Sequence, residues 1–279
     1  MHILTFDIEE WYHLYDHPKR FLTSQKNSHG FSLVKETNRI FRLLEEKNLK
    51  ATFFWVGEEA QKYPLLVKEL NKCGHEVGVH SLSHSKISRE NQKMFKTNTE
   101  IAVKTIEDII GVKVKSYRAP AFSLTNESLW ALEVLTDLGI EYDNSTVVRK
   151  NLGGQIIPST PFIIKNKDIM MKEFPVNSFS LFGFNYKYGG SGYFRVAPYK
   201  FLNPRLISSP YLMSYFHPRD FDKSIHRKIG PNPLLKLKYR LGTQRAFRNL
   251  ETLSKDILWT SIRDAAKKVN WDKTKIIEV

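Results

Sequence analysis

The sequence predicts an α/β fold built from parallel βαβ units, and three observations lead to this prediction. Short apolar segments alternate with longer segments of helical periodicity from the start of the chain to about residue 143. Polar and charged residues directly follow several of the short segments, which is where functional groups gather in parallel barrels. The length of 279 residues is enough for one large domain or two small ones, and a barrel of this size is common.

The first three predicted elements are a strand, a helix and a strand. Residues 3–7 are short and apolar and end in an acid, which is typical of a buried strand with a functional tip. Residues 34–47 carry apolar side chains at helical spacing. Residues 51–56 are mostly β-branched or aromatic, and Gly57 ends this second strand.

The next elements continue the alternation. Residues 65–73 are predicted to be a helix, because Pro64 precedes the segment and Gly74 follows it. Residues 76–79 form a short strand that delivers His80. The following helices and strands are expected, in order, over 97–110, 112–117, 127–138 and 140–143.

The rhythm weakens beyond about residue 144. Residues 172–176 and 211–216 still have the composition of strands, and residues 243–254 that of a helix. The stretch 181–195 is irregular and rich in glycine and aromatic residues. No repeat or linker is evident, so we expect a single barrel domain over 1–279, with a basic helical extension from about 223 to 279.

Composition indicates an ordinary globular protein, with 41% hydrophobic and 26% charged residues. No apolar run is long enough for a membrane-spanning helix. The first residues do not have the pattern of a secretory signal. Cys73 is the only cysteine, which fits a reducing compartment. We therefore expect a cytoplasmic protein.

The net charge of +14 favours contact with an anionic partner, and a generally basic surface without a partner is an equally open alternative. Residues 223–248 contain eight Lys or Arg and no Asp or Glu, with leucines interleaved. Such a stretch is compatible with peripheral contact at an anionic inner membrane face, or with a phosphate-bearing substrate. It is equally compatible with a loop and helix that cover the barrel. No nucleic-acid-binding motif is present, so nucleic acid is not expected as a partner.

Acids and histidines at the predicted strand ends are candidate site residues. Asp7 and Glu9 are two apart, so on a strand they point to the same side. His80 and His84 are four apart, and on a helical turn they would share one face, as metal-binding pairs do. Each pair alone is more often an ordinary acidic cluster or a pair of unrelated histidines. His75, before the strand, is expected at the surface.

Two later strand ends add an arginine and a histidine. Arg118 follows the strand 112–117, and a buried arginine there requires a carboxylate partner, for which Asp7 is a candidate. Pro120 stiffens the following turn. His217 follows the strand 211–216, and an imidazole suits proton donation to a leaving amine, because imidazole groups in general titrate near neutral pH.

Taken together, these segments resemble the polysaccharide deacetylases of carbohydrate esterase family four. The resemblance is closest to the branch associated with bacterial surface and exopolysaccharide synthesis. Each motif is weak alone, but their common order makes the resemblance specific. It extends from Thr5 to about His217, and rests on the segments Thr5-Phe-Asp-Ile-Glu-Glu-Trp11, Ala51-Thr-Phe-Phe-Trp-Val-Gly57, His80-Ser-Leu-Ser-His84, Arg118-Ala-Pro-Ala-Phe122, Glu173-Phe-Pro-Val176, Gly189-Gly-Ser-Gly-Tyr-Phe-Arg195 and Tyr215-Phe-His-Pro218.

The resemblance implies a distorted (β/α) barrel with fewer than eight complete units and one divalent metal ion, most often zinc. By position, it assigns metal binding to Glu9, His80 and His84. It makes Asp7 the general base and His217 the general acid. Arg118 would hold Asp7 ionised and correctly oriented. The backbone N–H of Ala121 would stabilise the oxyanion, and Pro120, Phe122 and Tyr193 would contact substrate.

Three positions depart from the pattern of this family. Many relatives have an aspartate where Glu9 stands, and many have a glycine where Phe122 stands. The aspartate that orients the acidic histidine in relatives is not evident, and Asp143 and Asp220 both remain candidates for that role.

The resemblance implies hydrolysis of an N-acetyl group from an amino sugar in a bacterial surface polysaccharide or its biosynthetic intermediate. The substrate is expected to be phosphate-bearing or lipid-linked. A deformylase or a cyclic-amide hydrolase on the same fold is an alternative. A non-catalytic glycan-binding barrel is an alternative of another class, although binding alone has no use for a metal, a base and an acid.

Overall fold

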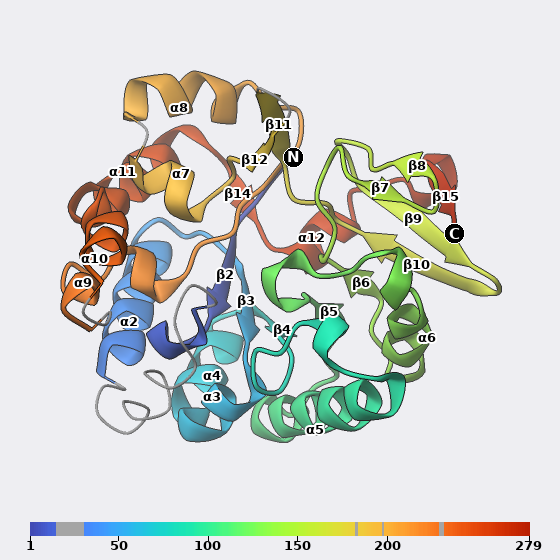
Figure 1. The fold of residues 1–279 in the computed structure, drawn as a ribbon. Helices are drawn as coiled ribbons and strands as arrows, with labels where there is room; N and C mark the ends of the chain where they lie inside the picture. Colours follow the sequence, from blue (N-terminus) through green and yellow to red (C-terminus); the bar gives the residue numbers. More distant parts are fainter. Residues whose placement is uncertain (15–30, 182–183, 197, 229–231) are drawn as a thin grey trace.

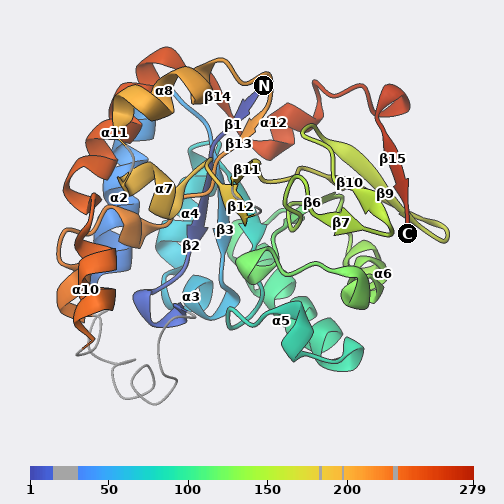
Figure 2. The ribbon, with the colours of Figure 1, turned by 45° about the horizontal axis from the view of Figure 1, so that its top comes forward.

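The computed structural model describes residues 1–14, 31–181, 184–196, 198–228 and 232–279. Figure 1 shows a central group of strands with helices packed around it. The same arrangement is seen from another direction in Figure 2.

Parallel strands form the centre of the fold. β2 (Thr5–Ile8), β3 (Thr52–Trp55) and β4 (Glu76–Val79) are buried along their whole length. They continue in parallel through β5 (Ser116–Tyr117) and β6 (Tyr142–Asp143) to β10 (Ile169–Glu173). Burial on both faces explains why these segments are apolar or aromatic without strict alternation.

The barrel closes through a second set of strands. β1 (His2–Ile3) pairs in parallel with both β13 (Leu212–Met213) and β14 (Trp259–Thr260). On the far side, the Asn177 side chain donates to Tyr211 O (3.0 Å) and accepts from Met213 N (2.7 Å), so a side chain joins β13 to the segment after β10.

This ring confirms the predicted barrel. In the described ranges it comprises β1 and β2, which are one strand interrupted at Leu4, together with β3 to β6, β10 and β13, so fewer than eight strands form it. The seam at Asn177, where a side chain replaces ladder hydrogen bonds, makes the barrel distorted.

The first-half helices lie outside the strands (Figure 1). They are α2 (Phe31–Glu46), α3 (Gly57–Lys62), α4 (Pro64–Lys72), α5 (Gln92–Ile110) and α6 (Trp130–Asp137). Asn91 caps α5 by accepting from Met94 N at 2.9 Å, and Gly111 ends it with a φ of 74°. The sequence predicted these helices except α3, which is a short helix directly after β3.

The later half adds elements that the sequence did not predict. β9 (Phe162–Asn166) runs antiparallel to β10 and also pairs with β15 (Ile276–Glu278). The stretch expected to be irregular contains the hairpin of β11 (Ser178–Leu181) and β12 (Phe184–Lys187), followed by α7 (Ser191–Val196). The other elements of the later half are β7 (Asn151–Leu152), β8 (Gln155–Ile156), α8 (Tyr199–Ile207) and α12 (Ile262–Ala266).

Short 3-10 turns occur in both halves of the described chain. They are η1 (Trp11–His13), η2 (Ile87–Arg89), η3 (Pro120–Phe122), η4 (Asn126–Ser128), η5 (Pro218–Asp220) and η6 (Trp271–Lys273).

The basic stretch folds into α9 (Ile225–Lys228), α10 (Pro233–Arg240) and the start of α11 (Thr243–Asp256). Its buried side chains Ile225 and Tyr239 pack with Trp11 and Tyr12 at the end of the first strand. The stretch therefore covers one side of the barrel, and β14 and β15 tie the segment after it into the sheets. The division into one domain with a C-terminal extension stays a prediction. None of the helices in the described ranges is long and apolar enough to cross a bilayer.

Candidate metal centre and active site

Side chains from the carboxyl ends of the strands meet around one pocket. Asp7 lies on β2, His80 directly follows β4 and Arg118 directly follows β5. Asp7 N donates to Phe216 O (2.8 Å), which places His217 beside the tip of β2. The pocket has a volume of about 380 Å³. Its walls are formed by Asp7, Glu9, His80, His84, Ala119, Ala121, Phe122, Tyr186, Lys187, Ser191, Gly192, Tyr215, His217 and Arg219.

Glu9, His80 and His84 form a group that could hold a metal ion. One potential ligand atom from each lies within 4.8 Å of the others, and all three residues are buried. Glu9 Oε2 lies directly against His84 Nε2. A carboxylate oxygen and imidazole nitrogens that converge in this way fit a metal better than they fit one another. Two histidines and a carboxylate are also a typical ligand set of catalytic zinc sites.

The expected helical turn between the two histidines is wrong. The segment from His80 to His84 is a loop, in which Ser81 and His84 have left-handed backbones with φ of 63° and 59°. The start of α3 supports the loop, because Gly57 N and Glu58 N donate to Ser81 O and Leu82 O at 2.9 Å each. A Cβ at Gly57 would lie 3.0 Å from Leu82 Cδ1, so only glycine fits there without a shift.

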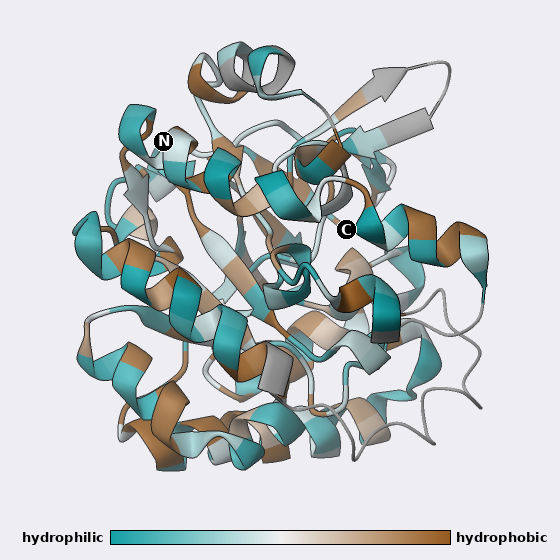
Figure 3. Cartoon of the chain, turned by 90° about the vertical axis from the view of Figure 1, so that its left-hand side faces the viewer, coloured by the Kyte–Doolittle hydropathy of each residue, from teal (hydrophilic) through white to brown (hydrophobic). Residues whose placement is uncertain are grey.

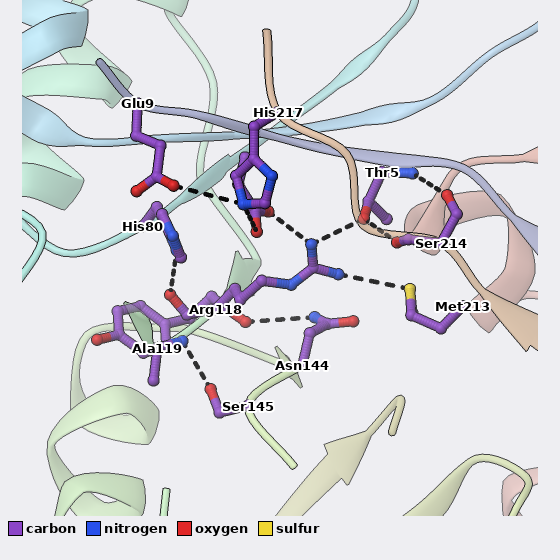
Figure 4. A network of polar contacts seen from close by, with 12 residues as sticks. Thr5, Glu9, His80, Arg118, Ala119, Asn144, Ser145, Met213, Ser214 and His217 are labelled. Carbon is purple, nitrogen blue, oxygen red and sulfur yellow. Dashed lines mark hydrogen bonds and ion pairs between the residues drawn. The ribbon is translucent and has the colours of Figure 1, made fainter. Parts of the chain in front are cut away.

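The contacts of His80 favour the neutral imidazole tautomer that can bind a metal through Nε2. Its Nδ1 lies 2.8 Å from Arg118 O, as Figure 4 shows. A carbonyl oxygen only accepts, so Nδ1 carries the hydrogen and Nε2 keeps a lone pair. Burial lowers the pKa of His80 to about 4, against the opposing effect of the Asp7 charge, so the ring is neutral near pH 7.

Arg219 is a site residue that the sequence analysis missed. Its Nη1 donates to Glu9 Oε1. Burial alone would raise the pKa of Glu9, but the Arg219 and His84 charges hold it well below its usual value. The signal was present in the sequence, because Arg219 stands two positions after His217 on the same turn. Arg219 thus fixes one carboxylate oxygen and leaves the other directed at the histidines.

Asp7 pairs with Arg118, as the sequence suggested. Arg118 is completely buried, and its Nη1 donates to Asp7 Oδ1 (2.6 Å) and to Thr5 Oγ1 (2.7 Å). Its guanidinium also lies 4.3 Å from the centre of the Phe54 ring. Burial would raise the pKa of Asp7, yet Arg118, with smaller contributions from His80 and His217, keeps it below the usual value. Asp7 is therefore ionised near neutral pH.

Asp220, and not Asp143, contacts His217. Asp220 Oδ2 lies 2.9 Å from His217 Nδ1 and accepts from His217 N at the same distance. The other ring nitrogen of His217 lies 3.4 Å from Glu9 Oε1 and 3.8 Å from Asp7 Oδ2. Asp143 instead accepts from Ser145 Oγ at 2.5 Å. Asp220 therefore holds the His217 ring with its second nitrogen toward the pocket.

The loop after β5 forms another wall of the pocket. Ala121 and Phe122 have left-handed backbones, with φ of 59° and 56°, and both residues line the pocket. Pro120 is buried and is not among the lining residues, so direct substrate contact by its ring is not supported. Tyr193 lies on α7, and its side chain is outside the described part of the structure. His75 is completely buried, so its expected surface position was wrong.

The lowered pKa of Asp220 predicts a specific dependence of folding stability on pH. Burial would raise its pKa, but His217, Arg195 and Arg219 lower it from 3.8 to about 2. The ionised group therefore stabilises the fold above pH 3.8, and this contribution is lost as the pH falls through about 2. We expect the stability advantage of the wild type over Asp220→Asn to shrink by about 2 kcal/mol between about pH 5 and pH 2. Denaturant unfolding across this range measures it.

The exposed Asp168 offers a matched control, because Asp168→Asn should track the wild type at every pH. Parallel pH profiles for the wild type and Asp220→Asn would contradict the role of the Asp220 charge.

Comparison with known proteins gives two matching family models. Residues 4–142 match the polysaccharide deacetylase model, and residues 145–267 match a domain of unknown function, DUF3473. Asp7, Glu9, His80, His84 and Arg118 lie in the first region.

Two proteins of similar sequence are named as deacetylases. A peptidoglycan-N-acetylglucosamine deacetylase of Bacillus cereus is 33% identical over 98 residues, which are 35% of this chain and 36% of that protein. Chitin deacetylase 2 of Cryptococcus neoformans is 26% identical over 109 residues, which are 39% of this chain and 24% of that protein. The chain thus matches less than two thirds of the length of these relatives.

Solved structures share the fold. A Mycobacterium smegmatis protein assigned to the polysaccharide deacetylases has a TM-score of 0.69 at 16% identity, covering 99% of this chain and 92% of that chain. A Bacillus anthracis protein described as a CE4 family pseudoenzyme has a TM-score of 0.52 at 12% identity, covering 100% and 69%. At these identities the likeness concerns the fold alone. The family-model match identifies residues 4–142 of this chain as a member of the polysaccharide deacetylase family.

Proposed function

We propose that this protein is a metal-dependent hydrolase that removes the N-acetyl group from an amino sugar of a bacterial surface polysaccharide or its biosynthetic intermediate. The observation that carries the proposal is the meeting of three groups in one pocket. These groups are the ligand set of Glu9, His80 and His84, the ionised Asp7, and the histidine His217. A glycan-binding module would not need this combination.

Zinc is the proposed metal, because two imidazoles and one carboxylate leave a position open for water or substrate. When bound there, the ion would polarise the amide carbonyl and lower the pKa of water.

The protein side chains then divide the proton transfers between them. Asp7, ionised and held by Arg118, accepts a proton from the attacking water. At the same time the water oxygen forms a bond to the carbonyl carbon of the amide. The N–H of Ala121, at the pocket wall, stabilises the negative charge on the former carbonyl oxygen. His217 donates a proton to the amine as the carbon–nitrogen bond breaks. The products are acetate and a free amine. Phe122, opposite Tyr215 in the wall, would contact the sugar.

Acid release from a panel of N-acetylated nucleotide sugars and lipid-linked glycans tests the proposal. Zinc-loaded protein should release acetate and equimolar amine, chelation should stop the release, and added zinc should restore it. Formate in place of acetate would favour a deformylase. Tight glycan binding without any released acid would favour the non-catalytic alternative.

We further propose that the enzyme acts in the cytoplasm, at the face of an anionic membrane, on a phosphate-bearing or lipid-linked substrate. Cys73 as the only cysteine is compatible with a reducing compartment. On α10, Leu234 and Leu237 are 76% and 53% exposed, and Leu241 just after it is 45% exposed. Their spacing places them on one face, interleaved with lysine and arginine. Figure 3, which views this side of the molecule, shows mixed hydrophobic and hydrophilic residues along its helices. Such a face fits an anionic lipid surface.

Vesicle co-sedimentation tests the membrane contact. The wild type should sediment with phosphatidylcholine vesicles that contain phosphatidylglycerol, and Leu234→Asp/Leu237→Asp should lose most of this binding. The matched control is Leu65→Asp on α4, because Leu65 is 82% exposed but lies outside the basic stretch. Equal binding of the double variant and the wild type would contradict the proposal.

A further inference from the structure

Lys187 is a pocket cation that the proposed mechanism does not use. It ends β12 and lines the same pocket as Asp7 and His217. Its Nζ lies 4.6 Å from the centre of the Phe122 ring and 5.8 Å from that of Tyr215. These two rings meet edge to face at 5.3 Å, so they form a preformed support for the ammonium group.

Two other cations at the site, the pocket residue Arg219 and the buried Arg118, have carboxylate partners, whereas Lys187 has none among the described residues. Arg118 donates to Asp7, and Arg219 donates to Glu9. Within the described ranges, no carboxylate forms an ion pair with Lys187 Nζ, and no hydrogen bond satisfies it. The Lys187 side chain is half-buried, so its ammonium group has lost part of its hydration without gaining an anion.

The electrostatic surroundings of Lys187 are also positive. Burial is the largest influence that lowers its pKa, to about 8, and the Lys150 and Lys86 charges act in the same direction. Asp7 acts in the opposite direction, but it is already paired with Arg118. Near pH 7 most of the lysine is still protonated, so this wall of the pocket presents a positive charge without a counterion.

We propose that Lys187 binds an anionic substituent of the sugar substrate, a carboxylate or a phosphate, next to the amide that is hydrolysed. This inference rests on the proposed function and names the substrate class. An anion at this position would accept hydrogen bonds from Nζ while the rings of Phe122 and Tyr215 hold the ammonium in place. A neutral N-acetylated sugar would leave the charge unsatisfied, so the enzyme should prefer acidic substrates.

Three matched disaccharides of N-acetylglucosamine test the inference, with glucose, glucuronate or glucose 6-phosphate as the second sugar. In the wild type, at least one acidic disaccharide should exceed the neutral one in kcat/KM by about tenfold or more. Lys187→Met should reduce this ratio by about tenfold, mainly through KM, and Lys187→Arg should restore it. The acidic disaccharide that the wild type prefers shows whether the bound anion is a carboxylate or a phosphate.

Lys172→Met is the matched control, because Lys172 also lies over two aromatic rings, Tyr142 and Trp271, but outside the pocket. This control should keep the wild-type ratio. The inference is overturned if the wild type shows no preference, or if Lys187→Met keeps the wild-type ratio.

A binding measurement separates this inference from the deacetylase proposal. Calorimetric titration of Asp7→Asn with the same disaccharides should show tighter binding of an acidic one, and Asp7→Asn/Lys187→Met should lose that preference. Selective binding through Lys187 without hydrolysis by the wild type would refute the deacetylase and keep the anion site. Hydrolysis without any acid preference would keep the deacetylase and refute the anion site.

Discussion

Replacing His84 with alanine is expected to remove the bound metal and to abolish turnover. The variant loses one of three ligands, and Glu9 and His80 alone do not define the position of an ion. We expect metal affinity to fall by more than about 100-fold, since even the loss of an outer contact costs 10- to 100-fold. Metal content after dialysis, measured by mass spectrometry, and acetate release check both parts. His80→Ala should behave in the same way.

A histidine outside the pocket provides the control. His226 on α9 is half-buried and does not line the pocket, so His226→Ala should keep both metal and activity. Full activity of His84→Ala in metal-free buffer would contradict the assigned site.

Replacing Asp7 with asparagine is expected to lower kcat by about 10² to 10⁴-fold while the metal stays bound. Asparagine has nearly the same shape and retains an oxygen that can accept from Arg118, but it cannot take the proton of the attacking water. Because Arg118 holds the pKa of Asp7 below 3.8, the wild type should not lose activity through protonation of Asp7 until the pH falls below that value. Steady-state kinetics across pH, together with metal content, measure this.

The combination of results for Asp7→Asn distinguishes a base from a ligand. Loss of turnover with full metal content supports the role of Asp7 as the base. Loss of metal in proportion to activity would make Asp7 a ligand instead, and near wild-type turnover would remove it from the mechanism.

The sequence was most informative where strands end. Asp7, His80, Arg118 and His217 each follow a short apolar segment, and parallel strands bring their carboxyl ends to one edge of a barrel. Because this geometry is fixed by topology, residues more than 200 positions apart could be placed together without coordinates.

Local conformation was less predictable. The spacing of His80 and His84 equally suits a helical turn and a loop, and the left-handed backbones of Ser81 and His84 decide for the loop. These backbones depend on the contacts that Gly57 and Glu58 make with the loop, and such tertiary contacts leave no periodic pattern in the sequence.

The partners of the site residues were also beyond the sequence. Asp143 ends β6, whereas Asp220 follows the predicted strand 211–216, and only the turn of η5 brings Asp220 to His217. Arg219 reaches Glu9 across 210 positions. Lys187 escaped notice because its stretch has no regular periodicity, whereas the structure forms a hairpin there that directs the lysine at the pocket.

The most direct test of the central claim is anomalous diffraction from crystals of the zinc-loaded protein. We expect one peak about 2.0–2.2 Å from a Glu9 oxygen and from one nitrogen each of His80 and His84. A peak elsewhere, with these three side chains directed away from one another, would contradict the metal centre and the hydrolytic function built on it.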